Sequence, residues 1–125
     1  MKYLLLIYNN PTSKVGEPES AAAQRLQGHV SLYRELASAG KVVSSAALPD
    51  PPQVSTLQVR GGVPAVTDGP YLEAKEYLAG YYLVDVDTLD EAAEIATRIP
   101  CGAAGAVEIR PINEEVTNLV RGEAG

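Results

Sequence analysis

The segment KYLLLIY, residues 2–8, decides the fold class, because it is apolar at odd and even positions alike. Successive side chains of a strand point to opposite faces of a sheet, so this pattern predicts a strand buried on both faces. The segment EYLAGYYLVDV, residues 76–86, carries apolar side chains on both parities in the same way. Two such strands predict a sheet that needs a cover on each face.

One predicted helix lies between the two strands in the sequence. From about residue 20 to 39, Leu26, Val30, Tyr33 and Ala37 recur at helical spacing, and Gly40 stands where a left-handed C-terminal cap belongs. This stripe predicts the side of the helix that packs on the sheet.

A second helix is predicted after residue 88. The residues TLDE, 88–91, fit a capping box, in which the threonine hydroxyl accepts from the backbone N–H three residues on. Pro100 ends the helix. The apolar stripe consists of Leu89, Ala92, Ala93, Ala96 and Ile99.

Four further strands are predicted, and together with the helices they define the order of the elements. Residues 41–48 and 106–112 predict one strand each, and residues 54–60 and 63–67 flank Gly61-Gly62 as an inserted β-hairpin. The order is β-α-β, hairpin, β-α-β, which predicts an α+β, ferredoxin-like split βαβ fold with an antiparallel sheet and both helices on one face. Residues 1–112 form the single domain and residues 113–125 a C-terminal tail.

The helix-free face of such a sheet would expose its apolar side chains. A second copy of the chain is the simplest cover, so the sequence predicts a homodimer.

Composition excludes several classes of partner. The chain of 125 residues has 16 acidic and 10 basic residues, a net charge of −6, and no basic cluster, so direct nucleic-acid binding is not expected. No apolar run is long enough to span a membrane.

The single cysteine, Cys101, allows no internal disulfide and fits a cytoplasmic protein, and nothing near it in sequence would activate a catalytic thiol. The histidine, cysteine and carboxylates lack metal-ligand spacing, and no cofactor motif is present, so we expect neither metal nor cofactor.

The stretch TDGPYLEAKE, residues 67–76, followed by GYYLV, residues 80–84, closely resembles the signature of the YCII-related proteins. Their bacterial branch is named after its Asp-Gly-Pro-Phe-x-Glu-x-Lys-Glu motif, in which Tyr71 here replaces the phenylalanine. The resemblance extends to the opening MKYLLLIY, to Ile99-Pro100 and to the ending VEIRPI, residues 107–112. It implies a ferredoxin-like domain that dimerises into an α+β barrel.

What the resemblance implies about function is limited. Most of these relatives have no established activity, and some are encoded beside extracytoplasmic-function sigma factors. A few relatives in the wider superfamily are enzymes, among them a dehydrochlorinase of chlorinated aromatic compounds and isomerases of the muconolactone type. A histidine and an aspartate are proposed as the acid/base pair of the YCII-like relatives, and these carry over onto His29 and Asp68.

Each of these residues also has a structural interpretation. Imidazole titrates near neutral pH, so His29 is suited to pass a proton, with Asp68 orienting it. Alternatively, His29 only borders the sheet, and Asp68 only starts the turn Asp68-Gly69-Pro70. Lys75 either binds an anionic ligand or belongs to a solvated rim.

Two further groups are candidates for binding a substrate. The hydroxyls of Tyr33 and Tyr82, together with those of Tyr77 and Tyr81, would suit a polar pocket. Glu108 and Arg110 share one parity of the last strand, so they either line a polar pocket or pair at the dimer face, or they face water at an edge.

Two functions therefore remain open. The first is a cofactor-free lyase or isomerase, or a ligand-binding protein, that binds a small organic acid or phenol. In this function His29 and Asp68 are the catalytic residues. The substrate-binding residues are Tyr33, Lys75, Tyr82 and Arg110. This function predicts a cavity between the first helix and the sheet. The second is a non-catalytic dimeric adaptor or sensor linked to sigma-factor regulation, and it predicts no ligand-sized cavity.

Overall fold

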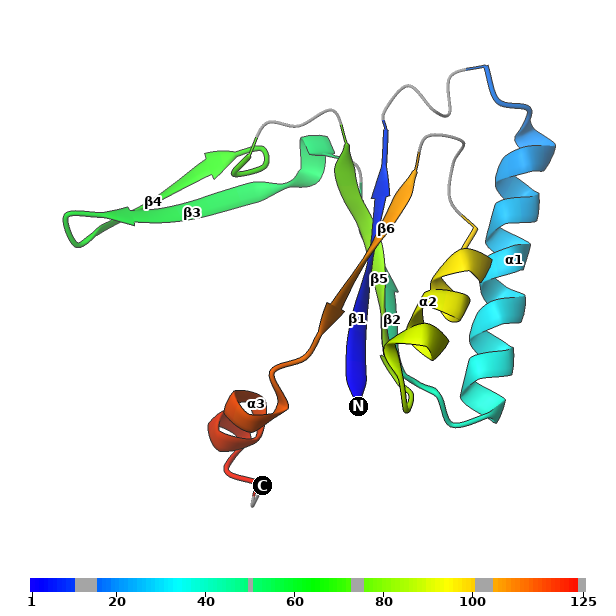
Figure 1. Cartoon of the computed structure of the whole chain (residues 1–125). Coiled ribbons are helices and arrows are strands. Elements are labelled where there is room, and N and C mark those ends of the chain that lie inside the picture. The colour runs from blue at the N-terminus through cyan, green and yellow to red at the C-terminus, as the bar shows by residue number, and fades with distance from the viewer. Residues whose placement is uncertain (11–15, 50, 73–75, 101–104, 124–125) are drawn as a thin grey trace.

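The computed structural model describes residues 1–10, 16–49, 51–72, 76–100 and 105–123 (Figure 1). Lys75 and Cys101 lie outside these ranges. The helices and strands confirm the predicted α+β class. In chain order they are β1 (Lys2–Asn9), α1 (Glu19–Ser38), β2 (Val42–Ala47), the short 3-10 helix η1 (Pro51–Gln53), β3 (Ser55–Arg60), β4 (Val63–Asp68), β5 (Tyr77–Asp85), α2 (Leu89–Arg98), β6 (Ala106–Pro111) and α3 (Glu114–Arg121).

Four strands form one antiparallel sheet in the order β2-β5-β1-β6. The inner strands are β1 and β5, the two segments that are apolar on both parities. The connections β1-α1-β2 and β5-α2-β6 join strands that are not neighbours. This order is compatible with the predicted split βαβ arrangement. None of the helices in the described ranges combines the length and apolar content that crossing a membrane would require.

The core lies between one face of the sheet and the helices α1 and α2 (Figure 1). Burial alternates along β1: Leu5 and Ile7 are buried, whereas Leu4 and Leu6 are only half-buried. Within one chain, therefore, the helices cover one face of the sheet, and the face opposite them stays partly exposed. The core residues are Tyr3, Leu5, Ile7, Leu32, Leu36, Tyr82, Val84, Val86, Ala92, Ile95 and Ile99.

Helix α1 packs on the sheet through a different stripe from the predicted one. Its buried residues are Leu32 and Leu36. The predicted core residues Leu26 and Tyr33 are 67% and 41% exposed. The prediction was wrong because Leu26, Val30 and Tyr33 line a cavity beside the core, where an apolar side chain need not be buried.

Helix α2 begins as the capping box predicts. The Thr88 hydroxyl accepts from the Glu91 backbone N–H at 3.2 Å. Ala92 and Ile95 are its buried residues, whereas Leu89, which was predicted to be buried, is 54% exposed at the first position of the helix. The N-terminal end of the predicted stripe therefore faces solvent.

A bulge in β5 changes which side chains face the helices. Ile7 pairs with Gly80 and Tyr8 with Leu78, so Ala79 is an extra residue in this strand. Side-chain parity is reversed across such a residue.

As a consequence, Tyr77 and Tyr82 lie on the same face of the sheet, although their positions in the sequence differ by an odd number. Tyr77 pairs with Asn9, which continues the buried parity of β1. Both tyrosines line the cavity beside α1.

Strands β3 and β4 form a separate two-stranded antiparallel sheet. It projects from the domain on the side away from α1 (Figure 1). Gly61 and Gly62 make the turn at φ 56° and 79°, values that suit a type I′ hairpin. Its apolar side chains are largely exposed: Leu57 62%, Val59 62%, Val63 66% and Val66 69%.

The residues after position 113 form helix α3, where the sequence predicts only a tail. The Asn113 side chain accepts from the Val116 N–H, and Gly122 ends the helix at φ 72°. Val116, Leu119 and Val120 follow helical spacing and are 52%, 71% and 82% exposed. Like the hairpin, α3 carries an apolar stripe that the described part of the chain leaves exposed.

Candidate functional site

A cavity of about 540 Å³ lies between α1 and the β2-β5 side of the sheet. This volume falls in the range of small-molecule sites. Its walls come from α1, from β1, β2 and β5, and from Pro100. The side of α1 that shows the apolar stripe Leu26, Val30 and Tyr33 forms one wall.

His29 and Tyr82 form a hydrogen-bonded pair inside this cavity. His29 Nδ1 lies 2.7 Å from the Tyr82 hydroxyl, and the two rings stack with centroids 5.9 Å apart. His29 is half-buried, whereas Tyr82 is only 3% exposed. The pair therefore joins the cavity wall to the hydrophobic core.

His29 occupies the core stripe of α1, one turn before Leu32 and two turns before Leu36. Its neighbour Gly28 lets the helix approach Pro100, since a Cβ at this position would lie 2.8 Å from Pro100 Cγ. This close contact holds the imidazole against the sheet and against the Pro100 backbone.

The environment of His29 favours its neutral form. Burial lowers the pKa of the imidazole, the Arg25 charge lowers it further, and a hydrogen bond to the Pro100 backbone opposes both. Proline has no N–H, so the ring must donate to the Pro100 carbonyl. If this donor is the Nε2–H, Nδ1 is the unprotonated nitrogen and accepts from the Tyr82 hydroxyl.

Tyr82 remains protonated near neutral pH, because burial raises the pKa of its hydroxyl above the ordinary 10.0. A neutral imidazole that accepts from a neutral phenol can take up one proton without burying a second charge. The pair can therefore remove a proton from a bound molecule and return it.

Two cations line the cavity, and no aspartate or glutamate does so among the described residues. Arg25 Nη2 lies 2.7 Å from Glu17 Oε1, and both side chains are largely buried. Arg34 is exposed and has no ion-pair partner in the described part of the chain. Arg34 thus gives the cavity one uncompensated positive charge, although the chain has a net charge of −6.

Asn9 adds a buried amide to the cavity wall. It is 7% exposed, and its Oδ1 has no hydrogen-bond partner in the described structure. Buried polar groups are nearly always hydrogen-bonded, so the Asn9 oxygen requires a donor that the described side chains do not supply.

The structure brings three of the predicted site residues together. His29, Tyr33 and Tyr82 line the same cavity, as do Tyr77 and Tyr81. Lys75 lies outside the described residues.

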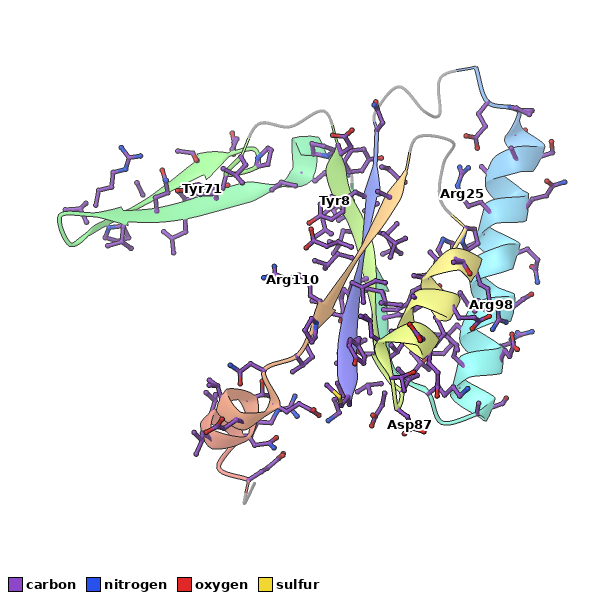
Figure 2. The ribbon with its side chains drawn as sticks, viewed as in Figure 1. Tyr8, Arg25, Tyr71, Asp87, Arg98 and Arg110 are labelled. Atoms are coloured by element: carbon purple, nitrogen blue, oxygen red, sulfur yellow. The ribbon has the colours of Figure 1, made fainter. Side chains whose placement is uncertain are left out.

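Asp68 and Arg110 lie elsewhere in the chain. Asp68 is exposed at the end of β4, in the hairpin on the other side of the sheet (Figure 1), and the hydrogen bond of the His29 side chain in the described structure is with Tyr82. Arg110 pairs with Leu4 in the sheet register, which puts it on the helix-free face. Figure 2 shows Arg110 on one side of the sheet and Arg25 on the other, beside α1.

The helix-free face also explains the two charges of the last strand. Arg110 Nε lies 3.8 Å from Glu108 Oε1, and the two side chains are 67% and 53% exposed. They form a surface ion pair, not a wall of the cavity. Within one chain, Arg110 cannot hold a molecule that His29 contacts.

The sequence interpretation missed Asn9, Arg25 and Arg34. Arg25 lies four residues before His29 and continues the Leu32-Leu36 stripe, so its spacing could have identified it. Asn9 gave no such signal, because it stands at the end of a strand followed by a proline, where asparagine is an ordinary turn residue. Among the described residues, no group of three His, Cys, Asp or Glu side chains is placed to bind a metal.

Comparison with known proteins shows which family the sequence matches. The model of the YCII-related domain matches residues 1–116. An uncharacterized protein of Rhizobium meliloti (strain 1021) is 31% identical over 114 residues, which cover 90% of this chain and 92% of that protein.

Proposed function

The chain belongs to the YCII-related domain family, and from the cavity beside His29 we propose that it binds a small organic acid or phenol and transfers a proton on it, as a cofactor-free lyase or isomerase. The observation that carries the proposal is the 2.7 Å contact between His29 Nδ1 and the Tyr82 hydroxyl inside a ligand-sized cavity.

The proposed step uses the pair as a unit. The Tyr82 oxygen accepts a proton from a carbon or oxygen of the ligand while its own proton passes to His29 Nδ1. The reverse transfer delivers a proton to another atom of the ligand, which is an isomerisation, or assists a leaving group, which is an elimination. The lowered pKa of His29 keeps the base unprotonated before the reaction.

Asp68 is the partner of His29 that the family resemblance implies, and we retain it only as a competing assignment. Within one chain the contact of His29 is with Tyr82. A carboxylate from β4 would have to come from the hairpin of another subunit. Substituting Asp68 by asparagine separates the two assignments.

We further propose that two chains associate through the helix-free face and build an α+β barrel, in a cytoplasmic protein. Support comes from the half-buried Leu4 and Leu6 at the centre of this face and from the exposed apolar residues of the hairpin and α3. A hairpin and an eight-residue helix are each marginal in water, so both need a partner surface.

An adaptor or sensor linked to sigma-factor control is the second candidate. The exposed stripe of Val116, Leu119 and Val120 favours it, since such a stripe suits contact with a protein. The cavity of about 540 Å³ argues against a pure adaptor, which needs no ligand-sized space next to its core, but not against a sensor that binds a ligand.

Deuterium exchange tests the proposed proton transfer without knowledge of the product. A panel of small carbon acids and phenols is incubated with the protein in D₂O, and loss of the exchangeable C–H signal is followed by NMR. We expect the wild type to accelerate exchange for at least one compound that also raises the melting temperature. His29→Gln should lose this acceleration by about 100-fold or more.

The matched control is Asp68→Asn, which should keep the wild-type rate. A compound that binds in the cavity but exchanges no faster than in buffer would refute the catalytic proposal. Loss of exchange in Asp68→Asn with Tyr82 dispensable would favour the His29-Asp68 assignment instead.

A further inference from the structure

We infer that the ligand of this cavity is an organic acid bound as its carboxylate, with a second polar group that reaches Asn9. The inference rests on the proposed function, because it concerns the same cavity. It selects the acid over a simple phenol and assigns Arg34 and Asn9 to binding.

Charge is the first argument. The net charge of the chain is −6, yet the charged side chains that line the cavity in the described structure are both arginines, Arg25 and Arg34. An anion entering this cavity approaches positive charge, whereas a cation is repelled.

The two arginines have different roles. They are nine residues apart on α1, which separates their Cα atoms by roughly 13 Å along the helix axis. Arg25 is already paired with Glu17 at 2.7 Å. Arg34 is therefore the residue that holds the carboxylate, and its planar guanidinium can make two parallel hydrogen bonds to one.

Asn9 is the second, independent argument. The residue is 7% exposed, it lines the cavity, and its Oδ1 lacks a partner in the described structure. The unpartnered atom is the amide oxygen, which can only accept, so the ligand group that it meets must be a donor such as a hydroxyl. A ligand that satisfies both residues carries a carboxylate at one end and a hydroxyl at the other.

The apolar side chains of Leu26, Val30 and Tyr33 and the His29-Tyr82 pair line the same cavity as Arg34 and Asn9. A ligand that contacts Arg34 and Asn9 therefore shares this cavity with the proton-transfer pair. The cavity also explains why the predicted helical stripe is apolar although it is not buried in the core.

Three probes that differ by one group each test the inference: 4-hydroxybenzoate, its uncharged amide 4-hydroxybenzamide, and benzoate, which lacks the hydroxyl. Dissociation constants are measured by calorimetry on the full chain. We expect 4-hydroxybenzoate to bind at least about tenfold more tightly than the amide, the factor that one charge-assisted contact provides. In Arg34→Gln this preference should fall to about twofold or less, and in the exposed control Arg121→Gln it should persist.

Asn9→Leu tests the second contact. This variant should lose the preference for 4-hydroxybenzoate over benzoate while its melting temperature without ligand is unchanged or higher, because it removes an unsatisfied buried amide. An Asn9 that only fills space would leave the preference intact.

Equal affinity for acid and amide in the wild type, or no binding of any of the three probes, would overturn the inference. The proposed proton transfer fails separately. If the protein prefers the acid but catalyses no exchange, the carboxylate inference stands and the proposed proton transfer is refuted. If it exchanges protons on neutral ligands and shows no preference for the acid, the proton transfer stands and the carboxylate inference is refuted.

Discussion

His29 shows how one residue links the packing of α1 to the chemistry of the cavity. It lies on the stripe that contains Leu32 and Leu36, and Gly28 beside it allows the close approach to Pro100. Burial and the Arg25 charge lower the pKa of the ring, so at neutral pH it is present as the base. The same features that bury the helix face therefore prepare the proposed catalyst.

The lowered pKa of His29 predicts how stability depends on pH. Between the folded-state pKa and the ordinary value of 6.5, the unfolded chain binds more protons at this residue than the folded chain does. The His29 contribution to the free energy of unfolding should therefore rise with pH through this window and be constant above it.

Urea unfolding of wild type and His29→Gln at several pH values from 4.5 to 8 measures this contribution as a difference, which cancels the common effect of the carboxylates. We expect the gap between the two proteins to shift in favour of the wild type as pH rises to about 6.5. A gap that stays constant would show that folding does not perturb the ring.

At the residue scale, the sequence predicted those site residues that have few alternatives. His29 is the only histidine, and Tyr82 belongs to a run of aromatic residues in a buried strand. Asn9 and Arg34 could not be identified, since each is common at a strand end or on a helix surface. Asp68 was chosen through a sequence motif, and a motif carries no information on which side of the sheet its residues lie.

At the scale of single elements, periodicity predicted the existence of the helices and strands better than their orientation. The stripe of Leu26, Val30 and Tyr33 is genuine, but a cavity accepts apolar side chains as a core does. In β5, the extra residue Ala79 reverses the parity of everything before it. A rule based on strict alternation cannot show such a shift.

Gly80 offers a test of how tightly β5 and β2 are joined. A Cβ at this position would lie 2.7 Å from the Ala46 carbonyl oxygen, which is a backbone atom that cannot turn away. Gly80→Ala should therefore destabilise the protein by about 1–3 kcal/mol, more than the entropic gain of roughly 0.5–1 kcal/mol from replacing glycine.

The measurement is urea unfolding, with Ser44→Ala on the neighbouring strand as the control, for which we expect a change within about 0.5 kcal/mol. A Gly80→Ala protein as stable as the wild type would mean that the two strands can separate at this point. The cavity wall that they share would then be adaptable.

At the scale of the whole molecule, three apolar surfaces are left exposed by the residues that the structure describes. These are the helix-free face around Leu6, the hairpin of β3 and β4, and the stripe of α3. Figure 1 shows that the hairpin and α3 both project from the domain on the side away from α1. The sequence predicted the uncovered sheet face but not α3, whose eight residues gave too short a pattern.

If the homodimer forms through the helix-free face, a charged residue placed at the centre of that face should dissociate it. Wild type should sediment as a dimer at micromolar concentration, and Leu6→Glu should sediment as a folded monomer, because a carboxylate at the centre of an apolar interface is not paired. Leu89→Glu, on an exposed residue of α2, is the control and should remain dimeric. A wild type that sediments as a single chain would refute the dimer.

The central claim, that the His29-Tyr82 pair transfers a proton on a bound ligand, is tested most directly by the exchange rate of Tyr82→Phe. This variant removes one oxygen and keeps the ring that packs in the core. The account predicts that it binds the ligand with nearly wild-type affinity and catalyses deuterium exchange at least about tenfold more slowly. A Tyr82→Phe protein that exchanges protons at the wild-type rate would contradict it.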